Sequence, residues 1–128
     1  MASLCLLLIG AFSATAFRPP FGPWEMLGHK KVNYGLDRDE IFVTRSEGVF
    51  SAIQIRVQQA PINMHKVAVH YGNGQVEDID LPENMAAGSS SRVIDLPGNK
   101  RIIKKVVFWY DTKNIAARKG VIQLWGRH

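Results

Sequence analysis

The stretch Arg92–Tyr110, RVIDLPGNKRIIKKVVFWY, predicts the centre of the fold. It contains two apolar runs, Arg92–Leu96 and Arg101–Tyr110, which the Pro-Gly-Asn residues 97–99 join. A turn rich in these residue types between β-branched and aromatic runs is typical of a β-hairpin. The second run is the longest strand candidate in the chain. We therefore expect a hairpin whose second strand is central in a sheet, with the other strands assembled on it.

The neighbouring stretches extend the same pattern. Residues 49–58 alternate apolar and polar side chains with a period of two, which predicts a strand of an antiparallel sheet with one buried face. Ile62–Tyr71 is a further strand, and its change of parity near Met64–His65 predicts a bulge or a change of sheet. The Gly-Asn-Gly sequence at 72–74 predicts a tight turn into a returning strand, Gln75–Leu81.

The remaining runs complete an all-β chain. Strands are also expected at Trp24–Gly28, Glu40–Arg45 and Gly120–Gly126, with loops at 35–39, 82–91 and 111–119. No long amphipathic helix is evident, and the connections leave no room for the crossover helices of a parallel sheet. The 128 residues suit one domain. We expect a single antiparallel β-sandwich of about eight strands, jelly-roll or immunoglobulin-like in outline.

The first residues have the composition of an export signal. Met1–Ala16 contains no Asp, Glu, Lys or Arg, and its apolar stretch Leu4–Phe12 is too short to span a bilayer. The small-x-small sequence at 14–16 predicts cleavage after Ala16, with an uncleaved anchor or a buried first helix as alternatives. We therefore divide the chain into a signal peptide (1–16), a Pro-rich leader (17–23) and a β-sandwich domain (24–128). The expected location is secreted or periplasmic, with no transmembrane segment after processing.

The single cysteine limits the chemistry. Cys5 lies inside the predicted signal peptide, so the processed chain would contain no cysteine. Disulfide bonds, thiol catalysis and Cys-ligated zinc would then be excluded. No GxSxG, SxxK, HxH or HExxH motif is present. We therefore predict no catalytic residue and no cofactor, and an enzyme is the less favoured class.

The charge is unevenly distributed. The net charge is +5, but residues 92–128 contain nine basic and two acidic residues, whereas the rest contains seven basic and nine acidic ones. The basic side chains gather at Lys100, Arg101, Lys104, Lys105, Lys113, Arg118 and Lys119. Such a surface can attract nucleic acid, acidic polysaccharide or an anionic membrane. The alternative interpretation is a solvated strand face whose lysines protect a sheet edge.

The alternation along the central strand selects the candidate binding residues. It places Ile102, Val106, Phe108 and Tyr110 on the inner face and Lys105 and Trp109 on the outer face. An exposed Trp beside polar side chains can stack on a sugar ring or a base, although a covering loop over Trp109 is the alternative. We therefore predict ligand binding at Lys100, Arg101, Lys105 and Trp109. Trp24 and Trp125 are expected in the core or at its rim.

A carboxylate cluster is a weaker candidate for a metal site. Asp37, Asp39 and Glu40 could together supply oxygen ligands to Ca²⁺. Their spacing is not that of an EF-hand, and Arg38 between them favours a salt bridge within a loop instead. The four histidines form no sequence pair typical of a metal site, and we interpret them as partly exposed residues of a sheet.

Several short motifs together resemble a known family. They are WExLG at Trp24–Gly28, DRD at Asp37–Asp39, YGNG at Tyr71–Gly74, IDLPG at Ile94–Gly98, Arg101-Ile102, Phe108-x-Tyr110 and LxG at Leu124–Gly126. This pattern resembles a family of small exported bacterial all-β proteins of unknown function, over nearly all of the processed chain. The resemblance implies a secreted or periplasmic β-domain, and it implies no particular activity.

These observations lead to one functional hypothesis and its alternatives. We expect an exported, non-enzymatic β-sandwich that binds an envelope protein or an anionic polysaccharide in the cell envelope or outside the cell. The alternative is an envelope enzyme or a Ca²⁺-dependent binder that uses the Asp37–Glu40 loop. Nucleic-acid binding fits the basic charge but conflicts with export.

Overall fold

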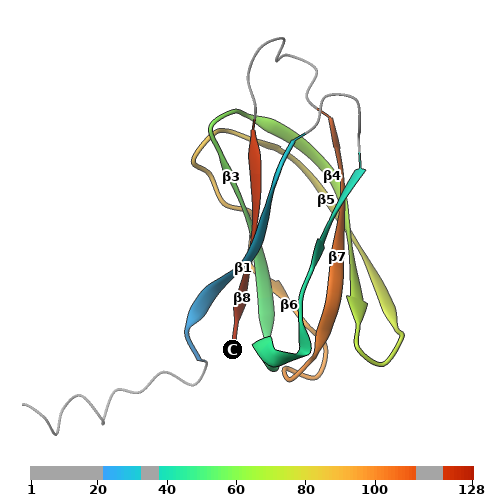
Figure 1. Ribbon diagram of the computed structural model, residues 1–128. Coiled ribbons are helices and arrows are strands. Elements are labelled where there is room, and N and C mark those ends of the chain that lie inside the picture. Colours follow the sequence, from blue (N-terminus) through green and yellow to red (C-terminus); the bar gives the residue numbers. More distant parts are fainter. Residues whose placement is uncertain (1–21, 33–37, 112–119) are drawn as a thin grey trace, which may run out of the picture.

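The computed structural model describes residues 22–32, 38–111 and 120–128 and is a two-layer β-sandwich (Figure 1). Sheet A has the strand order β1-β8-β3-β6, and sheet B has the order β2-β7-β4-β5. The elements are β1 (Trp24–Lys31), β2 (Arg38–Phe42), the 3₁₀ turn η1 (Arg45–Glu47), β3 (Ala52–Gln58), β4 (Ile62–Tyr71), β5 (Val76–Met85), β6 (Ile94–Asp95), β7 (Ile103–Asp111) and β8 (Val121–Arg127). All pairings between these strands are antiparallel, which confirms the predicted fold class.

Alternating side chains build the core between the sheets. Ile53, Ile55 and Val57 of β3 are fully buried, while the polar residues between them are half-buried on the outer face. From the opposite sheet, Val106 and Phe108 of β7 are also fully buried. The period of two seen in the sequence therefore separates core from surface, as expected when one face of each sheet is covered.

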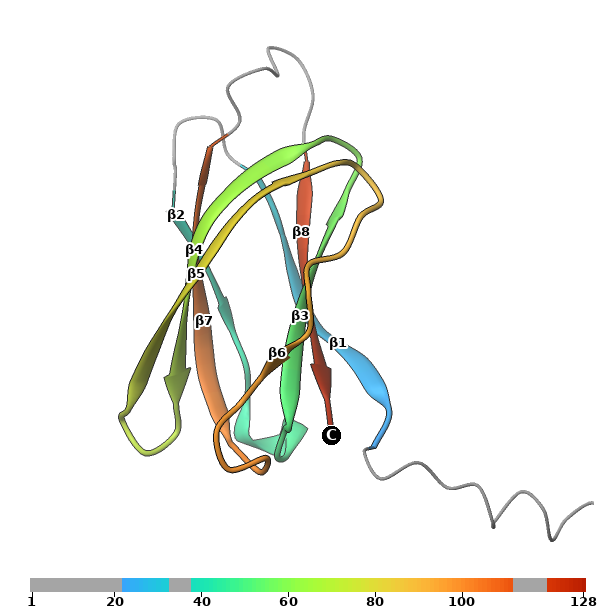
Figure 2. The same cartoon turned by 180° about the vertical axis from the view of Figure 1, so that it is seen from behind.

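The predicted hairpin is wrong, although its second strand is central as predicted. β7 lies between β2 and β4 in sheet B, whereas β6 pairs with β3 in sheet A. The turn itself forms, because the Asn99 N–H donates to the Leu96 carbonyl over 3.1 Å. The segment after it crosses from one sheet to the other at one end of the sandwich (Figure 2). A local turn sequence specifies that the chain reverses, but it does not specify which neighbour each strand will pair with.

Several strand boundaries differ from those predicted, and the differences in β2 and β5 are the most informative. β2 begins at Arg38, so the carboxylates expected in a loop lie partly in a strand. β5 continues through Pro82 to Met85, where a polar loop was expected. Pro82 is tolerated because β5 is an edge strand of sheet B, and Pro is confined to such positions within sheets.

Two bulges set which side chains face outwards on sheet B. The pairing of β4 shifts register between Met64 and Lys66, which confirms the bulge predicted there. A second shift pairs His70 with Lys105 but Tyr71 with Ile103, so Lys104 is an extra residue. As a consequence Ile103, rather than the predicted Ile102, enters the core. The alternation mispredicted this position because one inserted residue moves every preceding side chain of the strand to the opposite face of the sheet.

The two chain-terminal strands lie side by side. β1 pairs with β8 along its length in sheet A. The ladder continues beyond both strands, because the Gly22 N–H donates to the His128 carbonyl (2.8 Å) and the His128 N–H donates to the Pro23 carbonyl (3.1 Å). At this end Gly126 permits close packing, since a Cβ there would lie 2.7 Å from Cδ1 of buried Phe50.

The predicted signal peptide and residues 17–21 of the leader lie outside the described residues. Within the described residues, no helix is long and apolar enough to cross a membrane.

Candidate functional site

The four predicted binding residues lie in two separate places. Lys100 and Arg101 line a pocket at the end of the sandwich where the chain crosses from β6 to β7. Lys105 and Trp109 lie on the outer face of sheet B, paired with His70 and Lys66 of β4 respectively. The predicted binding site therefore combines residues from two separate surfaces, the pocket and the outer face of sheet B.

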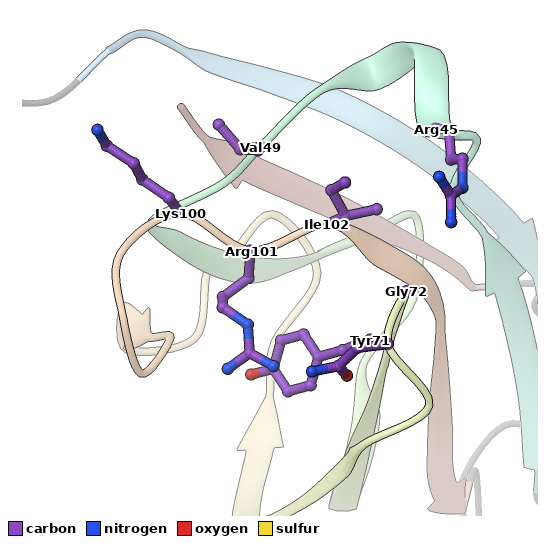
Figure 3. Close-up of a pocket in the computed structure, with 8 residues that line it drawn as sticks. Arg45, Val49, Tyr71, Gly72, Lys100, Arg101 and Ile102 are labelled. Carbon is purple, nitrogen blue, oxygen red and sulfur yellow. The ribbon is translucent and has the colours of Figure 1, made fainter.

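The pocket has a volume of about 340 Å³ and is lined by cations (Figure 3). It lies between the segment after β2, the β4–β5 turn and the β6–β7 crossover, and its lining residues are Arg45, Val49, Tyr71, Gly72, Asn73, Lys100, Arg101 and Ile102. Figure 3 shows Arg45 and Lys100 on opposite sides of the pocket, with Arg101 reaching over Tyr71. None of these lining residues is acidic, so the pocket carries three positive charges that no lining carboxylate offsets.

Arg101 is fixed in position by its neighbours. Its guanidinium carbon lies 3.7 Å from the centroid of the Tyr71 ring, a cation–π contact. Nη1 donates to the Pro97 carbonyl (3.1 Å), and Nη2 donates to Oε1 of Gln75 (2.8 Å). A guanidinium has five N–H donors, so these two bonds leave others for a ligand. Because the side chain is already ordered, binding an anion would cost little further conformational entropy.

Tyr71 supports Arg101 as a neutral phenol. Its hydroxyl donates to Oε1 of Glu77 over 2.6 Å. Burial, together with this bond to Glu77, raises the pKa of Tyr71 well above its usual range. The ring therefore stays uncharged at physiological pH, and its face remains available to the Arg101 guanidinium.

A glycine allows the floor of the pocket to form. A Cβ at Gly72 would lie 3.0 Å from Cγ2 of Ile102, so a larger residue would force the two segments apart. The Gly72 N–H donates to the Ile102 carbonyl over 2.8 Å. This close contact brings the β4–β5 turn against the crossover segment that contains Lys100 and Arg101.

The other two cations of the pocket are Arg45 and Lys100. Within the described part of the chain, neither Arg45 nor Lys100 forms an ion pair. Arg45 belongs to η1, which follows β2. No sequence motif includes Arg45, and Tyr71 belongs only to the YGNG turn motif. They reach the pocket only because η1 and the β4–β5 turn meet the crossover in space.

On the outer face of sheet B, cations flank Trp109. The Arg38 guanidinium lies 5.6 Å and the Lys66 ammonium 4.5 Å from the centroid of its ring. Lys66 also approaches Asp78 (3.7 Å), and Lys105 approaches Glu40 (3.4 Å). Trp109 is therefore half-buried among long polar side chains. The cations on this face already have acidic partners, unlike Arg45 and Lys100.

Of the two residues proposed for Ca²⁺ that the structure describes, Glu40 forms ion pairs and Asp39 accepts a backbone hydrogen bond. Glu40 lies 2.8 Å from Arg38 and 3.4 Å from Lys105, and the hydrogen bond from Arg38 lowers its pKa. Asp39 accepts the Glu40 backbone N–H over 3.1 Å. Asp37 lies outside the described residues, as do Lys113, Arg118 and Lys119. Among the residues that are described, no three acidic, His or Cys side chains are grouped to hold a metal.

Trp24 and Trp125 lie on the outer face of sheet A, not in the core. Both are half-buried, and Met26 is the residue paired with Trp125. The alternation along β8 predicts this position of Trp125. Ile122 and Leu124 alternate inwards on β8, which forces Trp125 onto the opposite face.

Comparison with known proteins identifies a family but no activity. Residues 1–126 match the model of the family described as a domain of unknown function, DUF2541, and the chain belongs to this family. A search of curated proteins and a search of solved structures each found no match. The arguments for a function therefore come from the site itself.

Proposed function

We propose that this protein is an exported, non-enzymatic β-sandwich that binds an acidic polysaccharide through the pocket of Arg45, Lys100 and Arg101. The observation that carries the proposal is the lining itself, which includes three cationic residues and no carboxylate. Uncompensated charge in a concave site concentrates field lines and attracts anions. The composition of the first 16 residues supports export.

The chemistry of Arg101 favours carboxylate or sulfate groups. A guanidinium is planar, always charged and weakly hydrated, and it matches the two oxygens of such groups. Arg101 is held by Tyr71 and Gln75, so it acts as the fixed donor. Arg45 and Lys100, on either side, would contact neighbouring charges of the same polymer. An acidic segment of an envelope protein offers similar groups, and the experiment below separates the two.

The test is binding to polygalacturonate, with dextran as the uncharged polymer and poly-glutamate as the acidic peptide. We expect calorimetry to show binding to polygalacturonate that weakens as salt rises from about 50 to 200 mM. Arg101→Ala should weaken binding by about tenfold to a hundredfold, because one hydrogen bond to a charged group contributes about 1.5–3 kcal/mol. Equal binding to poly-glutamate would favour a protein partner instead.

Lys104 provides a matched control for Lys100. Lys104 is exposed near the start of β7, four residues after Lys100, and it does not line the pocket. Lys100→Ala should weaken binding, while Lys104→Ala, with the same change of net charge, should leave it nearly unchanged. Equal losses would show that total charge rather than the pocket matters. Export is tested separately by mass spectrometry in the native host, where the expected chain begins at Phe17 and an intact Met1 would contradict it.

The alternative of a Ca²⁺-dependent binder or an envelope enzyme at Asp37–Glu40 gains no support from the geometry, because Arg38 and Lys105 already neutralise Glu40.

A further inference from the structure

A second surface, separate from the pocket, has the chemistry of a sugar-binding site. We call it the tryptophan face, and it consists of the outward side chains Trp24, Met26, Gln54, Arg56, Gln123 and Trp125 on β1, β8 and β3 of sheet A. The segment that precedes β6 pairs with the edge of β3 through Ser90 and Arg56. Within the described chain, no strand lies over the tryptophan face (Figures 1 and 2).

Four side chains of the tryptophan face hold one another in place, namely Gln54, Arg56, Gln123 and Trp125. The Trp125 indole N–H donates to Oε1 of Gln123 (3.0 Å), and the Arg56 guanidinium carbon lies 4.0 Å from the centroid of the indole. Arg56 donates from Nε and Nη2 to Oε1 of Gln54, both over 3.3 Å. Nε2 of Gln54 in turn donates to the Ser91 carbonyl over 2.9 Å. These groups are therefore already ordered in the folded protein, which lowers the conformational entropy that binding a ligand would cost.

The polar groups here are amides and guanidinium groups rather than acids. Arg56 is hydrogen-bonded to a neutral amide and not to a carboxylate. Among the described outward residues of sheet A, the single acid is Asp95, which pairs with Arg127 over 3.2 Å at the end of the face. Amides and guanidinium groups around an indole offer donors and acceptors that suit sugar hydroxyls, while the indole offers an apolar surface for the C–H side of a sugar ring.

We propose that the tryptophan face binds a polysaccharide chain by stacking its sugar rings on Trp24 and Trp125. Trp24 pairs with Arg127, two residues from Trp125 on the adjacent strand, so the two indoles are diagonal neighbours. Diagonal positions in an antiparallel sheet are about 7–8 Å apart, which lets one extended chain contact both rings. Met26 pairs with Trp125 and lies two residues from Trp24 on β1, so the three side chains form one apolar strip. The amide and guanidinium groups of Gln54, Arg56 and Gln123 border this strip and can bond the hydroxyls of a sugar chain stacked on it.

The test uses uncharged hexasaccharides of glucose, xylose and N-acetylglucosamine, with the full processed protein. We expect at least one to bind, and we expect Trp125→Ala and Trp24→Ala each to weaken binding by about fivefold or more, the scale of aromatic stacking. Trp109→Ala is the matched control, because Trp109 is a half-buried Trp flanked by cations on the opposite sheet. It should leave binding unchanged.

A second measurement uses the unmodified protein, so it does not depend on whether the Trp variants fold. In a titration followed by NMR, the indole N–H signals of Trp24 and Trp125 should shift and that of Trp109 should not. Absence of binding to all three sugars at millimolar concentration, or shifts confined to Trp109, would overturn the proposal. Arg101→Ala should leave binding of uncharged sugars intact, so failure here is distinguishable from failure of the pocket proposal.

Discussion

Glu40 shows how single side chains stabilise the outer face of sheet B. Its carboxylate lies 2.8 Å from Arg38 and 3.4 Å from Lys105. The Arg38 hydrogen bond lowers the pKa of Glu40 below 4.5, partial burial opposes this effect, and Lys105 adds to the lowering. The folded protein therefore holds the proton of Glu40 less tightly than the unfolded chain does.

Glu40→Gln should consequently alter the pH dependence of stability. A carboxyl with a depressed folded pKa contributes stability above its unfolded pKa and loses it as pH falls through the folded value. The variant should be less stable than the parent at pH 7 by up to about 1 kcal/mol, and the difference should shrink below about pH 4.5 in urea unfolding. Glu47→Gln is the control, because Glu47 has no ion pair in the described part of the chain. A difference that did not change with pH would contradict the role of Glu40.

Among the elements, the β6–β7 crossover connects the sheets and also supplies the pocket. Asn99 closes its turn on Leu96, and Arg101 pairs with Phe50 through two backbone hydrogen bonds of 2.9 Å. Since β6 and β7 belong to different sheets, this segment must span the thickness of the core. The crossover must therefore be long enough to reach from one sheet to the other, whereas a hairpin turn could be shorter.

Replacing residues 97–100 with the two-residue turn Asn-Gly should prevent folding or cost several kcal/mol. That change would suit a hairpin, because Asn-Gly is a favoured two-residue connection, but it is too short to cross the sandwich. Circular dichroism and thermal unfolding measure the outcome. A Gly/Ser replacement of unchanged length should keep the β-sheet spectrum. A shortened variant as stable as the parent would argue that β6 and β7 pair as a hairpin after all.

At the scale of the whole molecule, both sheets contribute to one core. Buried residues from β3 and β8 of sheet A and from β4 and β7 of sheet B belong to the same cluster. Neither sheet can bury its apolar face without the other. We therefore expect the sandwich to unfold as a single cooperative unit, as most small domains do.

The three tryptophans make this expectation measurable. A variant that keeps only Trp109 reports on sheet B, and one that keeps only Trp125 reports on sheet A. Their fluorescence transitions in urea should have midpoints that coincide with the loss of β-sheet circular dichroism recorded on each variant. Midpoints that differ between fluorescence and circular dichroism would indicate that the two sheets separate before they unfold.

The sequence predicted the parts of this molecule that depend on local pattern. The alternation at 49–58 predicted a strand there, and β3 occupies Ala52–Gln58 with Ile53, Ile55 and Val57 inwards. The charge count selected Lys100 and Arg101 as candidates, and both line the pocket. Pairing between strands depends on contacts between distant residues, so the partner of β6 could not be read from the turn beside it. The pocket could not be predicted for the same reason. Arg45 and Tyr71 approach Arg101 from elements far away in the sequence. No motif includes Arg45, and the YGNG motif marks Tyr71 only as the residue before a turn.

The pairing of the first and last strands means that the order of strands along the chain is not essential to the sandwich. Gly22 and His128 are hydrogen-bonded neighbours, so a short peptide could join them without disturbing either sheet. New ends placed at the exposed residues Ala86 and Ala87 would then leave all eight strands intact. A circular permutant of this kind could present the tryptophan face and the pocket on an unchanged scaffold, with its ends moved away from β1 and β8.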